Sequence, residues 1–353
     1  MTFDNSSWCF EDDLNHILDK SLPIFKKLQG ANIFMTGGTG FIGCWLLESI
    51  KHANTHLKTQ IKVTVLTRNV DHFKKKALHL AQDKDFNFIV GDIFDFEDSD
   101  NTYTHIIHAA TDASAELNER DPARMFNTIV EGTRRILDFA ARKKPQRILF
   151  LSSGAVYGQQ PFDLENVPES WLGGPNYLDP KSAYAEGKRA AEMLCAIYGK
   201  QYNLNISIAR IFALLGPYLS LDIHFAAGNF IRNAMAGKKI IVNGNGMPCR
   251  SYLYASDLTI WLLHLLELGT PNKPYNVGSD ESISIKALAE LTSNILHGGG
   301  VEILGAADPG WNLGRYVPDV ELIKKDLGLK REVSLEDAIL RTAIWNRQRK
   351  GSH

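Results

Sequence analysis

NIFMTGGTGFIG, residues 32–43, is a short apolar run followed by four glycines within seven residues. The run Asn32–Met35 predicts a strand, and a helix is predicted to begin at Ile42. The spacing Gly-x-x-Gly-x-x-Gly permits a tight turn and a close approach of the backbone to a pyrophosphate at the helix N-terminus. Because strand, loop and helix follow in this order, the stretch predicts a dinucleotide-binding loop rather than a plain glycine-rich turn. The loop residues expected to contact the dinucleotide are Gly37, Gly40, Phe41, Ile42 and Gly43.

Outward from this stretch, short runs rich in β-branched residues alternate with longer amphipathic segments up to about residue 210. The alternation is typical of a parallel sheet with helices on both faces, so we expect an α/β fold with a Rossmann-type doubly wound sheet. Asp121 and Asp179 each stand before a proline and predict two capped helix starts. The expected strands are 32–35, 62–66, 86–90, 105–108, 147–151 and 206–210, and the expected helices are 42–51, 72–80, 122–142 and 182–202.

The regular alternation weakens after about Leu215, where loops rich in Gly and Pro separate the remaining helices. This change predicts a smaller, mostly C-terminal α/β lobe that binds the substrate. Apolar residues at helical spacing before residue 31 predict a helix on the outside of the sheet domain. We expect three parts: a helical extension (1–30), a Rossmann domain (31–215) and a lobe (216–350) interleaved with that domain. The helices expected in the lobe are 226–235, 256–268, 285–296 and 335–348.

Composition narrows the class of protein. The 353 residues include 44% apolar and 22% charged side chains, as in an ordinary soluble globular protein, and the net charge of −1 gives no field that would gather nucleic acid or an anionic membrane. The four cysteines are far apart and predict neither a disulfide framework nor a metal site. The acidic N-terminus and the shortness of the apolar runs favour the cytoplasm.

The residues after the second and third predicted strands bear on the choice of dinucleotide. The acidic residue that would hold an adenosine ribose is replaced by Thr67-Arg68-Asn69. Arg68 could lie over the adenine, meet a 2′-phosphate or have no role, so NADP stays open beside NAD. Asp92 is a candidate partner of the adenine amine and could equally be a helix cap.

Three side chains predict the chemistry. Tyr184 and Lys188 are four residues apart on a predicted helix and therefore share a face. A cation about 4 Å from a phenol, at an effective dielectric near 20, interacts by up to ~4 kcal/mol, so we expect Lys188 to lower the pKa of Tyr184 by a few units. Ser153 ends a strand at the sheet edge where ligands lie, and can bind the same substrate oxygen that Tyr184 serves.

These motifs resemble the extended short-chain dehydrogenase/reductases, in particular the nucleotide-sugar epimerases and dehydratases. The resemblance runs from Asn32 to about Trp345 and rests on TGGTGFIG, HAAT (108–111), NTIVEGT (127–133), LSSGAVYG (151–158), YAEGK (184–188) and RSYLYASDL (250–258). It implies a tightly held NAD, Tyr184 as catalytic acid/base, Lys188 on the nicotinamide ribose and Ser153 as the third polar group. It also implies a homodimer in which the helices 122–142 and 182–202 form a four-helix bundle.

The resemblance further implies that Arg250 contacts the diphosphate of a nucleotide-sugar substrate. Arg315 and Asn229 are additional candidates for substrate binding, and Ile93, Ala109, Ala110 and Asn127 are additional candidates for cofactor binding.

The chain departs from the family pattern at two places. Dehydratases of the family typically carry Asp-Glu directly after the catalytic hydroxyl, and decarboxylating members carry a Glu two residues before the Tyr of VYG; this chain has Gly154 and Ala155 there. The second departure is that no Asn precedes Gly216-Pro217, for which Asn229 or His224 could substitute, although His224 could equally be structural.

Without those carboxyl groups, chemistry that needs only a hydride and the Tyr184 proton is favoured. We therefore expect a nucleotide-sugar 4-epimerase in which Tyr184 takes the hydroxyl proton and a transient 4-keto sugar is reduced on its other face. The alternatives are a 4-keto sugar reductase that uses NADPH, a 4,6-dehydratase with an unusual site, and a cofactor-binding regulator without catalysis.

Overall fold

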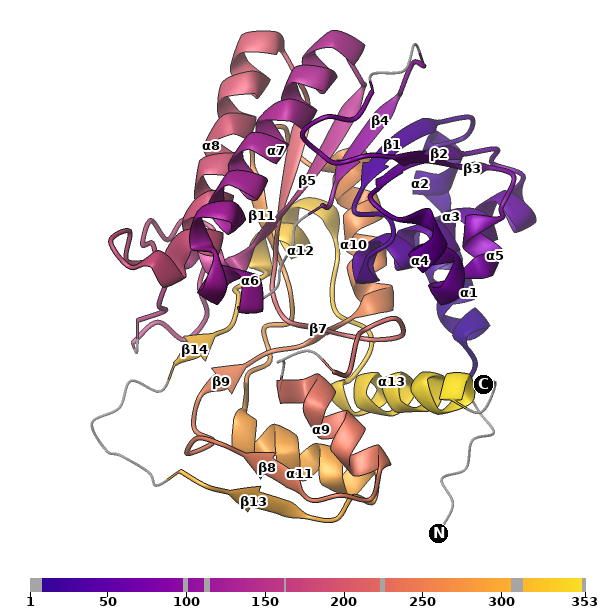
Figure 1. Ribbon diagram of the computed structural model, residues 1–353. Helices are drawn as coiled ribbons and strands as arrows, with labels where there is room; N and C mark the ends of the chain where they lie inside the picture. The colour runs from indigo at the N-terminus through magenta and orange to yellow at the C-terminus, as the bar shows by residue number, and fades with distance from the viewer. Residues whose placement is uncertain are drawn as a thin grey trace.

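The core of the protein is a seven-stranded sheet in the order β11-β6-β5-β4-β1-β2-β3, in which every pair of neighbours is parallel (Figure 1). The structure, a computed structural model, describes residues 8–97, 101–110, 115–161, 163–222, 226–305 and 314–350. The strands of this sheet are β1 (Asn32–Thr36), β2 (Lys62–Thr67), β3 (Phe86–Val90), β4 (His105–His108), β5 (Arg147–Ser153), β6 (Ile206–Ile211) and β11 (Pro274–Val277). The predicted Rossmann-type doubly wound fold is confirmed.

Alternate residues of the strands enter two separate cores, which explains why helices cover both faces. In β1, Ile33 and Met35 pack with helices α3 and α10, whereas Phe34 packs on the opposite face with α7 and α8. The helices are α1 (Phe10–Lys20), α2 (Leu22–Lys27), α3 (Phe41–Leu57), α4 (Val70–Lys76), α5 (Leu78–Ala81), α6 (Ala115–Arg120), α7 (Pro122–Lys143), α8 (Ala183–Tyr202), α9 (Ala226–Met235), α10 (Ala255–Leu268), α11 (Ile285–Ile295), α12 (Glu321–Leu327) and α13 (Leu335–Lys350).

Two predicted helix caps are present in the structure, and two segments that were each expected to form one helix are divided into two. The side chains of Asp121 and Asp179 accept hydrogen bonds from the backbone N–H groups of Arg124 and Lys181, so both predicted caps are confirmed. The single helix expected over 72–80 is instead two short helices, because Ala77, with φ −152° and ψ 70°, takes a non-helical conformation between them. The N-terminal extension is likewise two helices, and α2 begins with Leu22-Pro23.

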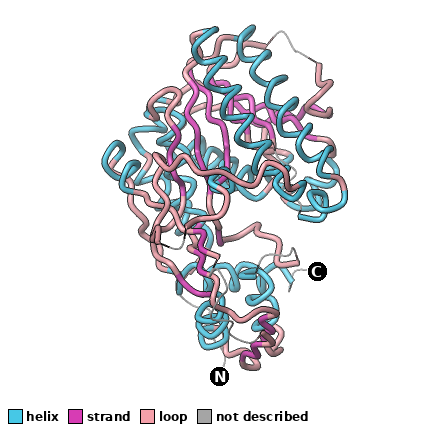
Figure 2. The backbone as a smooth tube through the Cα atoms, turned by 90° about the vertical axis from the view of Figure 1, so that its left-hand side faces the viewer, coloured by secondary structure: helices cyan, strands magenta, loops and turns pink. Residues whose placement is uncertain are grey.

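The C-terminal lobe extends away from the sheet in both views (Figures 1 and 2). It contains α9, α11 and α13, which pack together, and small sheets that pair residues far apart in sequence. These strands are β7 (Leu214–Leu215) with β10 (Leu253–Tyr254), β8 (Ile240–Val242) with β13 (Val301–Ile303), and β9 (Cys249–Arg250) between β12 (Ile283–Ser284) and β14 (Arg315–Tyr316). Because β11 belongs to the central sheet, the chain beyond residue 215 contributes to both parts.

The N-terminal extension is fastened by a buried carboxylate. Asp13 on α1 is 1% exposed; it accepts hydrogen bonds from the Tyr254 hydroxyl at 2.7 Å and from Arg341 of α13 at 2.6 Å. The first helix therefore joins the start of α10 to the last helix. Within the described ranges, no helix is long and apolar enough to cross a membrane.

We expect Asp13→Ala to lower the free energy of unfolding by about 2–4 kcal/mol, because it leaves a buried tyrosine hydroxyl and an arginine without their acceptor. Urea denaturation followed by circular dichroism measures the loss. Asp19→Ala, on the exposed side of the same helix, is the matched control. Equal stabilities of the two variants would contradict the role given to Asp13.

Candidate active site

The glycine-rich loop brings the end of β1 against the end of β4. Gly37 has φ +71°, and a Cβ on it would lie 2.6 Å from the backbone carbon of Ala109, so only glycine fits. The backbone N–H groups of Ala109 and Ala110 are held by Thr36, through its carbonyl oxygen and its hydroxyl. The predicted cofactor residues that follow β1 (Gly37) and β4 (Ala109 and Ala110) are thus brought together at the point of the sheet where the strand order reverses.

The N-terminus of α3 opens directly from this loop. Gly40 is the N-cap residue and has no side chain to occupy the first backbone N–H groups of the helix, while Phe41 and Ile42 form the first turn. A Cβ on Gly43 would lie 2.4 Å from Gly38, which keeps the turn tight. The arrangement fits a pyrophosphate, because the N–H groups and the helix dipole both favour an anion at this point.

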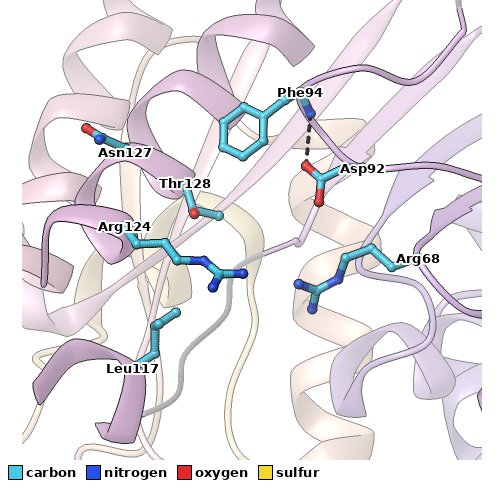
Figure 3. A pocket seen from close by; sticks show the side chains of 7 residues that line it. All are labelled: Arg68, Asp92, Phe94, Leu117, Arg124, Asn127 and Thr128. Carbon is cyan, nitrogen blue, oxygen red and sulfur yellow. Dashed lines mark hydrogen bonds between the residues drawn. The ribbon is translucent and has the colours of Figure 1, made fainter. Parts of the chain in front are cut away.

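A pocket of about 370 Å³ lies beyond the loop, at the ends of β2 and β3 (Figure 3). Arg68 and Arg124 extend into it from opposite sides. Asp92 lines the pocket and also accepts a hydrogen bond from the backbone of Phe94, so it stabilises its own turn as well. The pocket is lined by Arg68, Asp92, Phe94, Leu117, Arg124, Asn127 and Thr128.

Three predicted cofactor residues, Arg68, Asp92 and Asn127, therefore share this pocket. Ile93 lies beside them and packs against Gly132 of α7. The analysis of the sequence missed Arg124 and Thr128, although their spacing from Asn127 on one helix start is a signal that could have found them. The pocket and the loop together fit an extended dinucleotide.

The catalytic candidates meet where β5 ends. Ser153 is the last residue of β5, and its hydroxyl accepts a hydrogen bond from the backbone N–H of Ala155 at 3.2 Å. Tyr184, in the first turn of α8, lies close to the Ser153 hydroxyl. Burial raises the pKa of Tyr184 above its ordinary value, and the nearby Ser153 hydroxyl offsets part of that rise.

Lys188 differs from the expectation. Its ammonium donates to the carbonyl oxygen of Leu151 at 2.7 Å and lies over the ring of Phe150, and burial lowers its pKa to about 7. The pKa of Tyr184 is raised by burial rather than lowered by a neighbouring cation. Lys188 holds the end of β5 through this carbonyl oxygen, and sharing a helix face with Tyr184 does not give the lowered Tyr184 pKa that was expected.

The start of α8 is positioned by Asn118, which the analysis of the sequence missed. Its side-chain oxygen accepts the backbone N–H of Tyr184 at 3.0 Å, and its side-chain nitrogen donates to the carbonyl of Lys181 at 2.9 Å. Since Leu117 of the same helix, α6, lines the dinucleotide pocket, α6 contacts both halves of the site.

A buried ion pair fixes the middle of α8 on the sheet. Arg210 of β6 donates from Nε and Nη2 to the two carboxylate oxygens of Glu192, at 3.0 and 2.6 Å. Ser152 donates to Glu192 at 2.5 Å, and Arg210 also donates to the hydroxyl of Tyr157 at 2.8 Å. Ser152, the residue before Ser153, is thereby hydrogen-bonded to α8, the helix that carries both Glu192 and Tyr184.

The ring of Phe212 leaves no room for a side chain at Gly154, one of the two positions that lack a carboxyl group. A Cβ on Gly154 would lie 2.5 Å from the ring of Phe212, which follows β6 and is buried. Phe212 also packs against Tyr316, with ring centroids 4.6 Å apart. The missing side chain at Gly154 is thus part of the packing of the site.

The predicted substrate residues lie in the lobe. Arg250 donates to the carbonyl oxygens of Cys249 and Gly314, and its guanidinium lies 6.0 Å from the Tyr316 ring. Arg315 is turned to Ser282 and the backbone of Glu165, apart from the Ser153 group. Asn229 is half-buried on α9; its role and that of Arg315 stay predictions. Thr111 and His224 lie outside the described residues.

Comparisons with known proteins agree with this geometry. Two UDP-glucuronic acid decarboxylases are similar in sequence. UDP-glucuronic acid decarboxylase 6 of Arabidopsis thaliana is 31% identical to this chain, and the alignment covers 87% of this chain and 86% of the relative. UDP-glucuronic acid decarboxylase 1 of Xenopus tropicalis is 29% identical, and the alignment covers 90% of this chain and 72% of the relative. Two solved structures have similar folds. A UDP-glucose 4-epimerase of Thermotoga maritima superposes with a TM-score of 0.77 at 22% identity, covering 90% of this chain and 99% of that one. A dTDP-glucose 4,6-dehydratase of Streptomyces venezuelae superposes with a TM-score of 0.78 at 24% identity, covering 91% of this chain and 98% of that one.

Residues 33–278 match the model of the NAD-dependent epimerase/dehydratase family. This match covers the dinucleotide loop, the Ser153–Tyr184 group and all seven strands of the central sheet except the first residue of β1. The predictions of the family and of its NAD cofactor are confirmed: the chain belongs to the NAD-dependent epimerase/dehydratase family.

Proposed function

We propose that this protein is an NAD-dependent nucleotide-sugar 4-epimerase. The observation that carries the proposal is the group at the end of β5: the hydroxyls of Ser153 and Tyr184 lie close together, and the two residues after Ser153, Gly154 and Ala155, hold no carboxyl group. The names of the relatives support a nucleotide sugar as the class of substrate.

The proposed reaction needs only the groups that the site holds. NAD, when bound, accepts a hydride from the sugar carbon and returns it. Tyr184 takes the proton of the 4-hydroxyl as the hydride leaves, and Ser153 binds the same oxygen. The 4-keto sugar turns in the pocket, the hydride returns to its other face, and Tyr184 gives the proton back. Neither water nor CO₂ leaves, so no second acid or base is required.

Decarboxylation is the second candidate, because both curated sequences named above are UDP-glucuronic acid decarboxylases. Ala155 stands where decarboxylating members of the family carry a Glu, and the missing carboxyl group argues against decarboxylation.

The homodimer implied by the resemblance also stays a proposal. Met193 and Ile197 are 63% and 39% exposed, and they lie on α8, one of the helices that the dimer would use.

A panel of nucleotide sugars tests the reaction. The NAD-loaded protein is incubated with UDP-glucuronic acid and with the UDP-, dTDP-, CDP- and GDP-linked hexoses, and the products are identified by NMR and mass spectrometry. We expect at least one sugar to change configuration at carbon 4 without a change of mass. Release of CO₂ from UDP-glucuronic acid, or loss of water from a hexose, would contradict the epimerase. Tyr184→Phe should abolish turnover, while Tyr202→Phe, exposed at the end of the same helix, should not.

The two arginines of the dinucleotide pocket favour a third candidate, an NADPH-dependent reductase. We expect Arg68→Ala to weaken NADP binding about tenfold and NAD binding much less, because it removes a charge-assisted contact to the 2′-phosphate. Isothermal titration calorimetry measures both affinities, and Arg120→Ala on exposed α6 is the control. An equal loss for NAD and NADP would instead place Arg68 on the adenine.

The packing of Phe212 gives a prediction about stability. Gly154→Ala should lower the free energy of unfolding by about 1–3 kcal/mol, because the new methyl group overlaps the Phe212 ring. The matched control is Gly244→Ala, where a Cβ meets open space. Combining Gly154→Ala with Phe212→Leu should cost less than the sum of the two single changes in a urea denaturation series. Simple additivity would show that the ring does not close this position.

A further inference from the structure

Of three consecutive lysines at the end of α4, one turns inward to the dinucleotide loop. Lys74 and Lys75 are exposed, and Lys74 pairs with Asp71 of the same helix at 2.9 Å. Lys76 is half-buried, and its ammonium donates a hydrogen bond to the carbonyl oxygen of Thr39 at 3.0 Å. Since Thr39 lies within the glycine-rich loop, a cation from α4 is fixed on the loop that fits the pyrophosphate.

The contact with Lys76 means that one peptide group of the loop is held at both ends. The Thr39 carbonyl and the Gly40 N–H belong to the same peptide group, and this N–H donates to the carbonyl oxygen of Gly37 at 3.0 Å. Because a peptide group is planar, holding its oxygen and its N–H sets the direction in which the chain enters α3. Gly40 is the N-cap of that helix. The orientation of the N–H groups in the first turn of α3, which have no partner within a helix, therefore depends on this peptide group.

Lys76 is in turn held by α13 of the lobe. Arg349 donates to the backbone carbonyl of Lys76, one of the carbonyls that a helix leaves unpaired at its C-terminus. The guanidinium of Arg349 lies 4.7 Å from the ring centroid of Trp345 and 5.6 Å from that of Tyr218. The ammonium of Lys76 lies 5.7 Å from the same Tyr218 ring. The lobe thus reaches the dinucleotide loop through Arg349 and Lys76.

Tyr218, the ring that both cations approach, is itself fixed. It is buried, its hydroxyl donates to Glu48 of α3, and its ring packs on Trp345 with centroids 4.8 Å apart. The carboxylate of Glu48 offsets part of the repulsion between the two cations. Because Glu48 lies on the helix that begins at the loop, the contacts run from the loop through α4 and α13 and back to α3.

We propose that Lys76 is a positioning residue for NAD. Its ammonium holds the Thr39–Gly40 peptide group, so that the first N–H groups of α3 face the pyrophosphate. Its positive charge also favours an anion at the loop. Arg349 holds Lys76 in place, which lets the lobe support the cofactor loop. Lys76 has this role whether the protein epimerises, decarboxylates or reduces its substrate.

Lys76→Met tests the inference, since it removes the ammonium and keeps most of the side-chain volume. We expect the Kd values of NAD and of ADP, which both carry a pyrophosphate, to rise about tenfold, because a charge-assisted hydrogen bond is lost. The Kd of adenosine, which has no phosphate, should stay within about twofold. Isothermal titration calorimetry on the full chain, freed of bound nucleotide, measures NAD and ADP, and an NMR titration measures adenosine. Lys74→Met, exposed on the same helix, is the matched control and should leave all three affinities unchanged.

The pattern across the three ligands separates positioning from a structural effect. A general loosening of the Rossmann domain would weaken adenosine binding as much as NAD binding, and this result would overturn the inference. Unchanged Kd values for NAD and ADP would overturn it as well. Lys76→Arg keeps a cation at the end of the side chain and should bring both Kd values to within about threefold of the wild type. If Lys76→Arg binds NAD as weakly as Lys76→Met, the charge does not hold the loop and the inference is wrong.

Arg349→Met tests the support from α13. It should raise the Kd of NAD about threefold and leave adenosine unchanged, because Lys76 keeps its bond to Thr39 but loses its own anchor. Combined with Lys76→Met, it should add nothing to the loss caused by Lys76→Met alone. Losses that multiply would overturn the link through Lys76. All of these measurements follow binding without turnover, so they decide the role of Lys76 even if no nucleotide sugar is converted and the proposed function fails.

Discussion

The ion pair of Glu192 and Arg210 is the interaction on which the site depends. Both charges are largely withdrawn from water, which costs free energy unless every charged atom finds a partner. The pair meets this condition, since both carboxylate oxygens receive donors from Arg210 and one also receives the Ser152 hydroxyl. Ser152 is adjacent to Ser153, and Glu192 is one helical turn after Lys188. One interaction therefore sets the distance between the end of β5 and the helix that carries Tyr184.

Sequence patterns predicted the parts of the site whose cause is local. The glycine spacing, the strand periodicity and the two Asp-Pro caps each depend on neighbouring residues, and the structure has them as expected. Tyr316 and Phe212 could not be found in this way, because they meet beside Gly154 only through strand pairing and packing between distant segments. The lowered pKa expected for Tyr184 shows the same limit, since helical spacing predicts a face shared with Lys188 and not the burial that raises the pKa.

Belonging to a family leaves the reaction undetermined, because the same fold serves decarboxylation, dehydration and epimerisation in the proteins similar to this one. Few side chains separate these outcomes. Here the ring of Phe212 occupies the space beside Gly154, the residue after Ser153, and the hydroxyl of Ser153 lies close to Tyr184. An acid could not be restored at Gly154 by one substitution, since its side chain would first have to displace that ring.

The buried carboxylate of Asp13 also has a consequence for how the chain is made. Its partners Tyr254 and Arg341 follow it by 241 and 328 residues. Because Arg341 is synthesised 328 residues after Asp13, α1 cannot complete this packing while the segments between them are being made. Closing so long a loop is slow compared with forming local contacts. Helix α1 thus reaches its native surroundings later than the sheet segments that follow it, and it stays accessible to chaperones and proteases during that interval.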